Sequence, residues 1–181
     1  MTHTAFERPL EDEYLGYYGR YIGLVPEGDI LSTLASQNAT SLSLLRGLPE
    51  SKGGFRYAPG KWSIQELVAH LSDAERIFAD RALRFARADE TPLPGFEEND
   101  YVANGLFDDY PLAEIVDGFE NLRRSTISLF KLMSADATKR RGKANNAEIS
   151  VRALAYVIAG HELHHMNILR TRYLEAVDAA R

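Results

Sequence analysis

The chain has 181 residues, 45% of them apolar and 26% charged, as is typical of a globular protein with one buried core, and we expect residues 1–181 to form a single domain. Its formal net charge is −5 with acidic and basic residues interspersed, so it lacks the basic stripe that nucleic-acid binding requires. The absence of cysteine excludes disulfides, thiolate metal ligands and a cysteine nucleophile, and is compatible with a reducing cytoplasm.

An aromatic-rich leader precedes the first long helix. We expect the leader to lie on the helical core as a short helix, and its members are Tyr14, Tyr17, Tyr18, Tyr21 and Ile22. Apolar residues then recur at helical spacing over 29–46, and Gly47 and Pro49 end the pattern. The sequence therefore predicts the first long helix over 29–46.

The second predicted helix starts after Ser63 and ends near Ala88. Ser63 and Glu66 form a capping box, and Trp62 and Leu67 flank it as a hydrophobic staple. Four arginines lie on this helix among acidic residues, and we expect a solvated face of mixed charge from Arg76, Arg81, Arg84 and Arg87.

Residues 91–109 predict a long loop, because they contain two prolines, two glycines and an acidic run. Loops of this length often form lids or the walls of sites. We therefore expect Asn99 or Tyr101 to contact a substrate.

The remainder of the chain completes a helical protein. Helices are predicted over about 111–133 and 150–177, with a polar linker over 135–147. No segment sustains a period of two, so we predict no sheet of any size. Four helices that can pack antiparallel favour an all-α fold, a four-helix bundle onto which the leader packs.

Three of the five histidines fall within five residues of the last helix, at His161, His164 and His165. In heptad steps His161 and His165 take positions that elsewhere carry leucine, isoleucine or valine, so both face the bundle interior, while His164 lies on the flank. Two buried imidazoles one turn apart compete for scarce hydrogen-bond partners. A shared metal ion satisfies both rings, and we expect one here.

His70 on the second helix is the candidate third ligand, since it lies beside that helix's apolar stripe. It reaches the same interior if the second and fourth helices are neighbours. Taken alone, each histidine also fits a hydrogen-bonded core residue. Asp73, one turn beyond His70, is either a fourth ligand, a partner of a ligand or a solvated carboxylate.

The segment His161-Glu162-Leu163-His164-His165 also matches H-E-x-x-H, the zincin signature, in which the glutamate is the general base. A zincin cleft normally presents a strand edge to the peptide, and no sheet is predicted. The metallopeptidase interpretation is therefore a minor alternative. Glu162 is kept as a candidate catalytic base near the metal.

Several segments together resemble the DinB/YfiT-like superfamily of bacterial proteins over nearly the whole chain. They are residues 56–64 (RYAPGKWSI), 70–76 (HLSDAER), 81–84 (RALR), 92–96 (PLPGF), 159–165 (AGHELHH) and 173–174 (YL). The resemblance implies an up-down-down-up four-helix bundle. It also implies a divalent metal held by three histidines, which fall here on His70, His161 and His165.

The resemblance further implies a homodimer, and activities that include thiol transfer with bacillithiol or mycothiol and maleylpyruvate isomerisation. Our leading interpretation is a metal-dependent thiol transferase or hydrolase acting on a small molecule, with a low-molecular-weight thiol as co-substrate in the first case. Zinc or nickel is the expected ion, with manganese or iron as alternatives. A non-catalytic metal-binding or ligand-sensing bundle, and a bundle whose histidines hold no metal, stay open.

No run of apolar residues approaches the length of a membrane span, and the N-terminus lacks the pattern of a signal peptide. The sequence therefore predicts a cytoplasmic protein that has no membrane or nucleic-acid partner.

Overall fold

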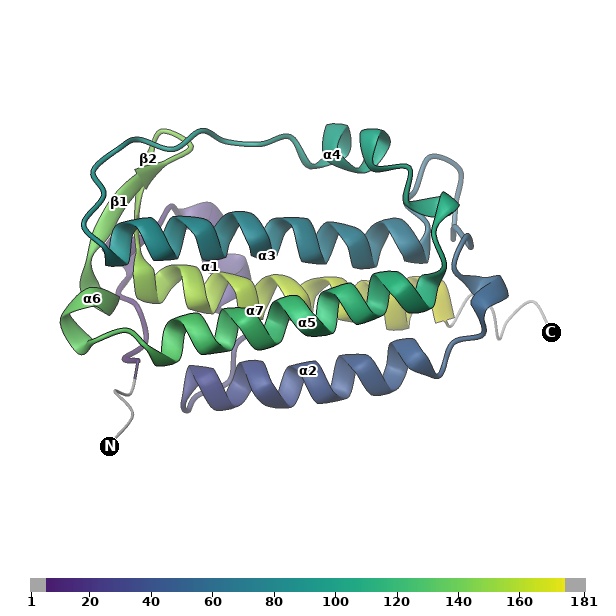
Figure 1. Cartoon of the computed structure of the whole chain (residues 1–181), viewed down its shortest axis with the longest axis horizontal. Helices are drawn as coiled ribbons and strands as arrows, with labels where there is room; N and C mark the ends of the chain where they lie inside the picture. The colour runs from purple at the N-terminus through teal and green to yellow at the C-terminus, as the bar shows by residue number, and fades with distance from the viewer. Residues whose placement is uncertain (1–5, 175–181) are drawn as a thin grey trace.

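Four long helices lie side by side in the computed structural model, which describes residues 6–174 (Figure 1). They are α2 (Ile30–Arg46), α3 (Ile64–Ala86), α5 (Leu112–Lys131) and α7 (Val151–Ile168). α2 and α7 run in one direction along the bundle, and α3 and α5 run in the other. The expected up-down-down-up four-helix bundle is confirmed, with α3 in contact with both α5 and α7.

Side-chain caps begin three of these helices, with Asp29 before α2, Ser63 before α3 and Ser150 before α7. The Ser63 hydroxyl accepts a hydrogen bond from the Glu66 N–H at 3.1 Å, and the Glu66 carboxylate accepts one from the Ser63 N–H at 2.7 Å. The predicted capping box is therefore present. α7 continues as a π-helical segment, Leu169–Leu174, and its predicted end near Val177 lies outside the described residues.

The aromatic leader follows a single-turn 3-10 helix, Glu11–Glu13, and forms α1 (Gly16–Ile22), which lies against α7. The predicted short helix is confirmed. The two backbones approach closely at Gly160, where a Cβ atom would lie 2.0 Å from the carbonyl oxygen of Tyr21. Only glycine at this position lets α1 approach α7 so closely.

Gly160→Ala is expected to lower the free energy of unfolding by about 1–3 kcal/mol, because the methyl group meets main-chain atoms that no rotamer change can move. Urea denaturation measures the change. Gly118→Ala on α5 is the control, since its Cβ would meet nothing within 4 Å. This control should raise stability by up to about 1 kcal/mol through helix propensity, and an equal loss in both variants would refute the close approach.

The connection from α3 to α5 returns along the whole bundle above α3 (Figure 1). The predicted loop over 91–109 is wrong in part, because it contains α4 (Glu98–Gly105) and a 3-10 turn, Phe107–Asp109. The Glu97 carboxylate accepts a hydrogen bond from the Asn99 N–H at 3.2 Å, and buried Val102 anchors the helix. α4 therefore depends on a local cap and one tertiary contact, neither of which produces a long periodic pattern.

The segment predicted as a linker over 135–147 is also structured. It holds α6 (Ala135–Lys139) and the antiparallel strands β1 (Arg141–Ala144) and β2 (Ala147–Ser150). The expectation of no sheet is wrong here, because strands of four residues are too short to show alternation. The available signal was the Asn145-Asn146 pair, whose φ angles of 50° and 62° fit a two-residue hairpin turn.

A buried charged cluster joins all four long helices, and we call it the Arg123 network: Ser41, Glu75, Arg123 and Glu162. Arg123 on α5 is fully buried and donates to Glu75 of α3 at 2.7 Å and to Glu162 of α7 at 2.6 Å. Ser41 of α2 donates to the other Glu162 oxygen at 2.6 Å. Burial alone would lower the pKa of Arg123, but the two carboxylates raise it above its ordinary value.

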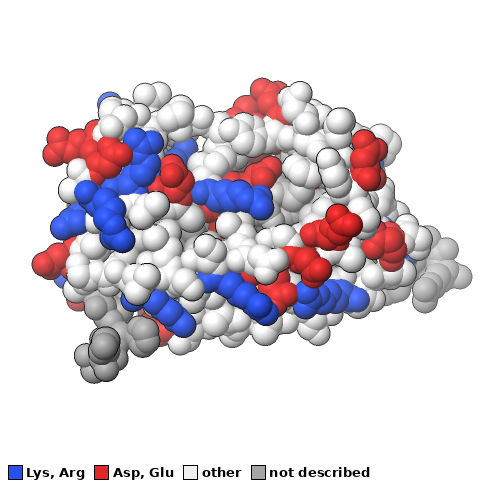
Figure 2. All heavy atoms as spheres, viewed as in Figure 1, with Lys and Arg blue, Asp and Glu red and all other residues white. Residues whose placement is uncertain are grey.

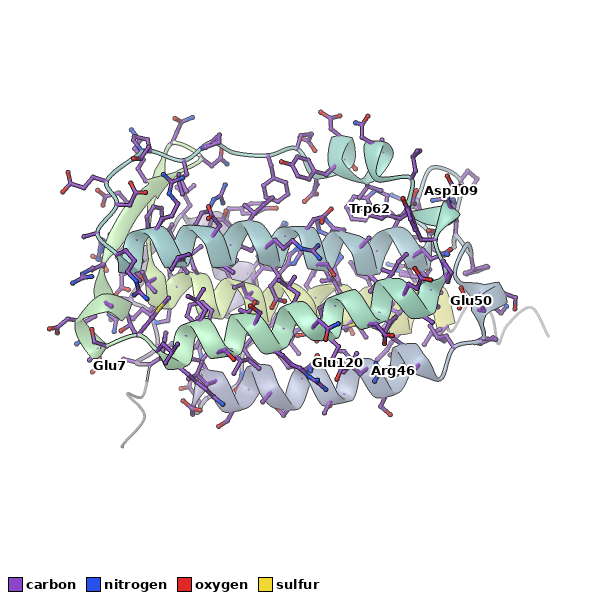
Figure 3. All side chains as sticks on the ribbon, in the orientation of Figure 1. Glu7, Arg46, Glu50, Trp62, Asp109 and Glu120 are labelled. Carbon is purple, nitrogen blue, oxygen red and sulfur yellow. The ribbon has the colours of Figure 1, made fainter. Side chains whose placement is uncertain are left out.

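The surface carries both signs of charge. Figure 2 shows basic and acidic side chains interspersed on one face of the bundle. Arg46 of α2 and Glu120 of α5, labelled in Figure 3, pair at 2.6 Å. Within residues 6–174, none of the helices combines the length and apolar character needed to cross a membrane.

Candidate metal centre

Three histidines from two helices meet in the bundle. His70 lies on α3, and His161 and His165 lie one turn apart on α7. Each offers a ring nitrogen, and the three nitrogens all lie within 4.8 Å of one another. We call these three residues the histidine cluster. His70 and His161 are 91 residues apart in the sequence, and the packing of α3 against α7 brings them together.

The cluster has the dimensions of a metal site. The Nε2 atoms of His70 and His161 are 3.1 Å apart. Two ligands of a tetrahedral ion with bonds of about 2.0–2.1 Å are separated by about 3.3 Å. Three neutral nitrogens converging at this spacing fit a divalent transition metal, and within the described residues the group contains no carboxylate.

Burial keeps the three imidazoles neutral at pH 7. It lowers the pKa of His70 to about 4 and, together with the neighbouring His70, His164 and Arg20, lowers the pKa of His165 to about 3. Burial and the adjacent histidines hold the pKa of His161 well below its ordinary value. Each ring therefore presents a lone pair, as a metal ligand must.

Aromatic side chains enclose the cluster. The Trp62 ring lies 4.7 Å from the His70 ring, and the Tyr21 ring lies 5.3 Å from the His161 ring, centroid to centroid. Figure 3 shows the Trp62 side chain between α3 and α4. These rings cover part of the histidine cluster, Trp62 on the His70 side and Tyr21 on the His161 side.

A cavity of about 330 Å³ opens onto His70 and His161, and we call it the main cavity because it reaches the histidine cluster. Its walls come from α1, α3, α7, residues 95–98 leading into α4, and Asn145 in the turn between β1 and β2. The aromatic wall residues are Tyr17, Tyr18, Tyr21, Phe78 and Phe96. The volume suits a small molecule, and the aromatic leader forms one side of it.

Asp73 and His164 lie outside the cluster. The Asp73 carboxylate accepts a hydrogen bond from Arg76 at 3.1 Å and lines a separate hollow with Tyr110. The half-buried His164 ring lies 5.1 Å from the His165 ring, at the flank where the sequence placed it. Neither residue belongs to the group of mutually close ligand atoms.

Asn99 and Tyr101 lie on α4 above the bundle but do not line the main cavity. Asn99 borders a smaller pocket with Trp62 and His165. Tyr101 lies against Phe96, at 5.3 Å between ring centroids. α4 therefore borders the histidine cluster on the His165 side.

Glu162, expected as a catalytic base, has both carboxylate oxygens engaged in the Arg123 network. It is 2% exposed and accepts from Ser41 and Arg123. Its side chain thus binds toward α2 and α5, whereas His161 beside it meets α3. This placement departs from the arrangement in which a zincin glutamate faces the open metal position.

The expected solvated face of arginines is wrong for Arg81. This residue is 4% exposed and lines the main cavity, while Arg76 is exposed as expected. Heptad steps from Ala74 through Phe78 to Arg81 and Phe85 were the signal, since they place Arg81 on the apolar stripe of α3.

Comparisons with known proteins agree with this geometry. Residues 33–169 match the DinB superfamily. A curated protein of Oceanobacillus iheyensis, named "Putative metal-dependent hydrolase", is 28% identical over 112 residues, which are 61% of this chain and 64% of that protein. This chain therefore spans less than two thirds of that relative.

Two solved structures share the fold. YfiT from Bacillus subtilis, described as a "probable metal-dependent hydrolase with an unusual four-helix bundle topology", has a TM-score of 0.63 and 16% identity, covering 91% of this chain and 92% of its own. The DinB-like protein YjoA from Bacillus subtilis has a TM-score of 0.60 and 16% identity, covering 84% and 92%. With the family match extending from α2 to the end of α7, the chain belongs to the DinB superfamily.

Proposed function

We propose that this chain binds one divalent metal ion through His70, His161 and His165 and acts as a metal-dependent hydrolase on a small molecule. The observation that carries the proposal is the convergence of three neutral ring nitrogens within 4.8 Å at the wall of a cavity. The names of the Oceanobacillus relative and of YfiT support hydrolysis in particular.

Three protein ligands leave coordination positions open, which is typical of catalytic rather than structural sites. When bound, such an ion supplies Lewis acidity toward water and carbonyl or phosphoryl groups. The ligands carry no charge, so they do not reduce the ion's electrophilicity as carboxylates would. Trp62, Tyr21 and Phe78 lie against these histidines, so in this proposal they limit the access of bulk water to the reacting group.

In this proposal Glu162 orients α7 through the Arg123 network instead of acting as the base. Zinc or nickel is the proposed ion, because imidazole nitrogens suit both, with iron and manganese as alternatives. A thiol transferase at the same site would need the thiol as a co-substrate, since the chain contains no cysteine. We also propose a homodimer in the cytoplasm, and light scattering after size exclusion tests the dimer.

The first experiment is elemental analysis of untagged protein, because a histidine tag binds metal itself. We expect close to one divalent ion per chain. Protein that stays metal-free after incubation with zinc, nickel and manganese would overturn the proposal.

The second experiment compares metal-stripped and reconstituted protein on a panel of small esters, amides and lactones. Hydrolysis that is lost on stripping and restored by the ion is the expected result. Conjugation of a low-molecular-weight thiol to an electrophile, without hydrolysis, would favour the transferase. Metal binding without either reaction would favour a non-catalytic binding protein.

A further inference from the structure

Arg81 is a buried cation in the wall of the cavity that reaches the histidine cluster. Its side chain donates from Nη2 to the Pro94 carbonyl oxygen at 2.7 Å, and its guanidinium lies over the Phe78 ring at 5.7 Å. The residue is 4% exposed, and none of the ion pairs found within residues 6–174 includes it. A guanidinium has five N–H donors, and here the Pro94 carbonyl and the Tyr18 hydroxyl accept from it, so donor capacity remains but no carboxylate pairs with it among the described residues.

The other buried arginines are paired. Arg123 binds Glu75 and Glu162, and Arg152 donates from Nε to Glu13 at 2.7 Å. An unpaired buried charge is costly, and burial lowers the pKa of Arg81 accordingly. Arginine stays protonated in proteins, so the free-energy cost of burying the Arg81 charge persists unless an anion binds the guanidinium.

The groups around Arg81 restrict which anion fits. Tyr18 faces it as a neutral phenol, because burial raises the pKa of that hydroxyl. Glu97 and Glu98 line the same cavity from the start of α4, and Asp80 adjoins Arg81 on α3. These three carboxylates disfavour a ligand with several negative charges, so the cavity suits a single carboxylate.

The main cavity extends from the cluster to Arg81 between aromatic walls. Eleven residues separate His70 from Arg81 on α3, which is about 16 Å along the helix axis. Tyr18, Phe78 and Phe96 lie along the cavity that joins them. A molecule occupying both ends would be elongated and apolar in its middle.

We propose that Arg81 binds a terminal carboxylate of the substrate and so positions the substrate's reacting group at the histidine cluster. The guanidinium fork matches a carboxylate in bidentate geometry. This inference rests on the proposed function, which it deepens by giving the substrate class: an elongated monocarboxylate with an apolar, preferably aromatic, middle.

Calorimetric titration tests the proposal with 4-phenylbutyrate and its neutral amide as probes, on both metal-loaded and metal-stripped protein. We expect the carboxylate to bind wild-type protein at least about tenfold more tightly than the amide, in both metal states. Arg81→Gln should remove this preference and keep a donor for the Pro94 carbonyl, while Arg81→Lys should keep part of it. Arg76→Gln, which changes an exposed arginine of the same helix, should leave it unchanged.

Equal binding of acid and amide to wild-type protein, a preference that survives Arg81→Gln, or no binding of the acid at its solubility limit would each overturn the proposal. Circular dichroism establishes that the variants are folded. The metal-stripped arm separates the two proposals: a preference there that depends on Arg81 stands even if the protein binds no metal. Conversely, the carboxylate binds the metal if only metal-loaded protein prefers the acid over the amide and Arg81→Gln does not change that preference. In that case the role of Arg81 is refuted and the proposed metal-dependent function stands.

Discussion

Untagged His161→Ala protein is expected to retain almost no tightly bound metal, whereas wild-type protein carries about one ion per chain. His161 is buried and offers a nitrogen 3.1 Å from that of His70. Its loss leaves only two candidate ligands, His70 on α3 and His165 on α7. Removing an outer-shell partner of a metal ligand costs roughly 10–100-fold in affinity, and removing a ligand itself should cost more. Elemental analysis and competition with a chelating dye measure the stoichiometry and the affinity.

His164→Ala is the matched control on the next turn of the same helix. Its ring is half-buried at the flank and lies outside the cluster, so its removal should leave the stoichiometry unchanged. His70→Ala, on α3, should behave like His161→Ala. Retention of metal by both of those variants, or its loss from His164→Ala, would exclude the assigned ligand set.

Arg123→Met is expected to destabilise the protein by about 3–5 kcal/mol, because it removes the cation from between two buried carboxylates. Methionine fills much of the arginine volume, so the loss arises from Glu75 and Glu162 left unpaired. Denaturation in urea at neutral pH measures the effect.

Arg124→Met provides the comparison at the adjacent position. Its side chain is 68% exposed and pairs with Glu120 on the surface, so the same substitution should change stability by less than about 1 kcal/mol. Comparable losses in the two variants would show that the Arg123 network contributes no more than a surface ion pair.

The heptad pattern predicts much of the site, because burial of a helix face follows from residue spacing. It places His161 and His165 inward and His70 beside the stripe of α3. The same steps place Arg123 and Glu162 inward as well: each continues a run of core positions, Phe119 to Arg123 and Ile158 to Glu162. Charge, taken as a sign of exposure, predicts a surface position for Arg81, whereas its spacing on α3 predicts the buried position that the structure shows.

Spacing cannot predict which buried charges meet. The pairing of Glu75 with Arg123 depends on the relative rotation and axial shift of α3 and α5, which are set by side-chain interdigitation along both helices. The close approach of the Gly160 and Tyr21 backbones likewise depends on where α1 packs on α7. α4 and the β1–β2 hairpin are too short for periodicity to indicate them.

The parallel course of α3 and α5 has a consequence for how this protein can diversify. Two neighbouring helices with the same direction require a return segment as long as the bundle, so residues 87–111 are present whatever the protein binds. That strap supplies Phe96, Glu97 and Glu98 to the cavity but no metal ligand. Substitutions within it can therefore alter ligand selection while the helices that hold the histidines, and the core beneath them, stay unchanged.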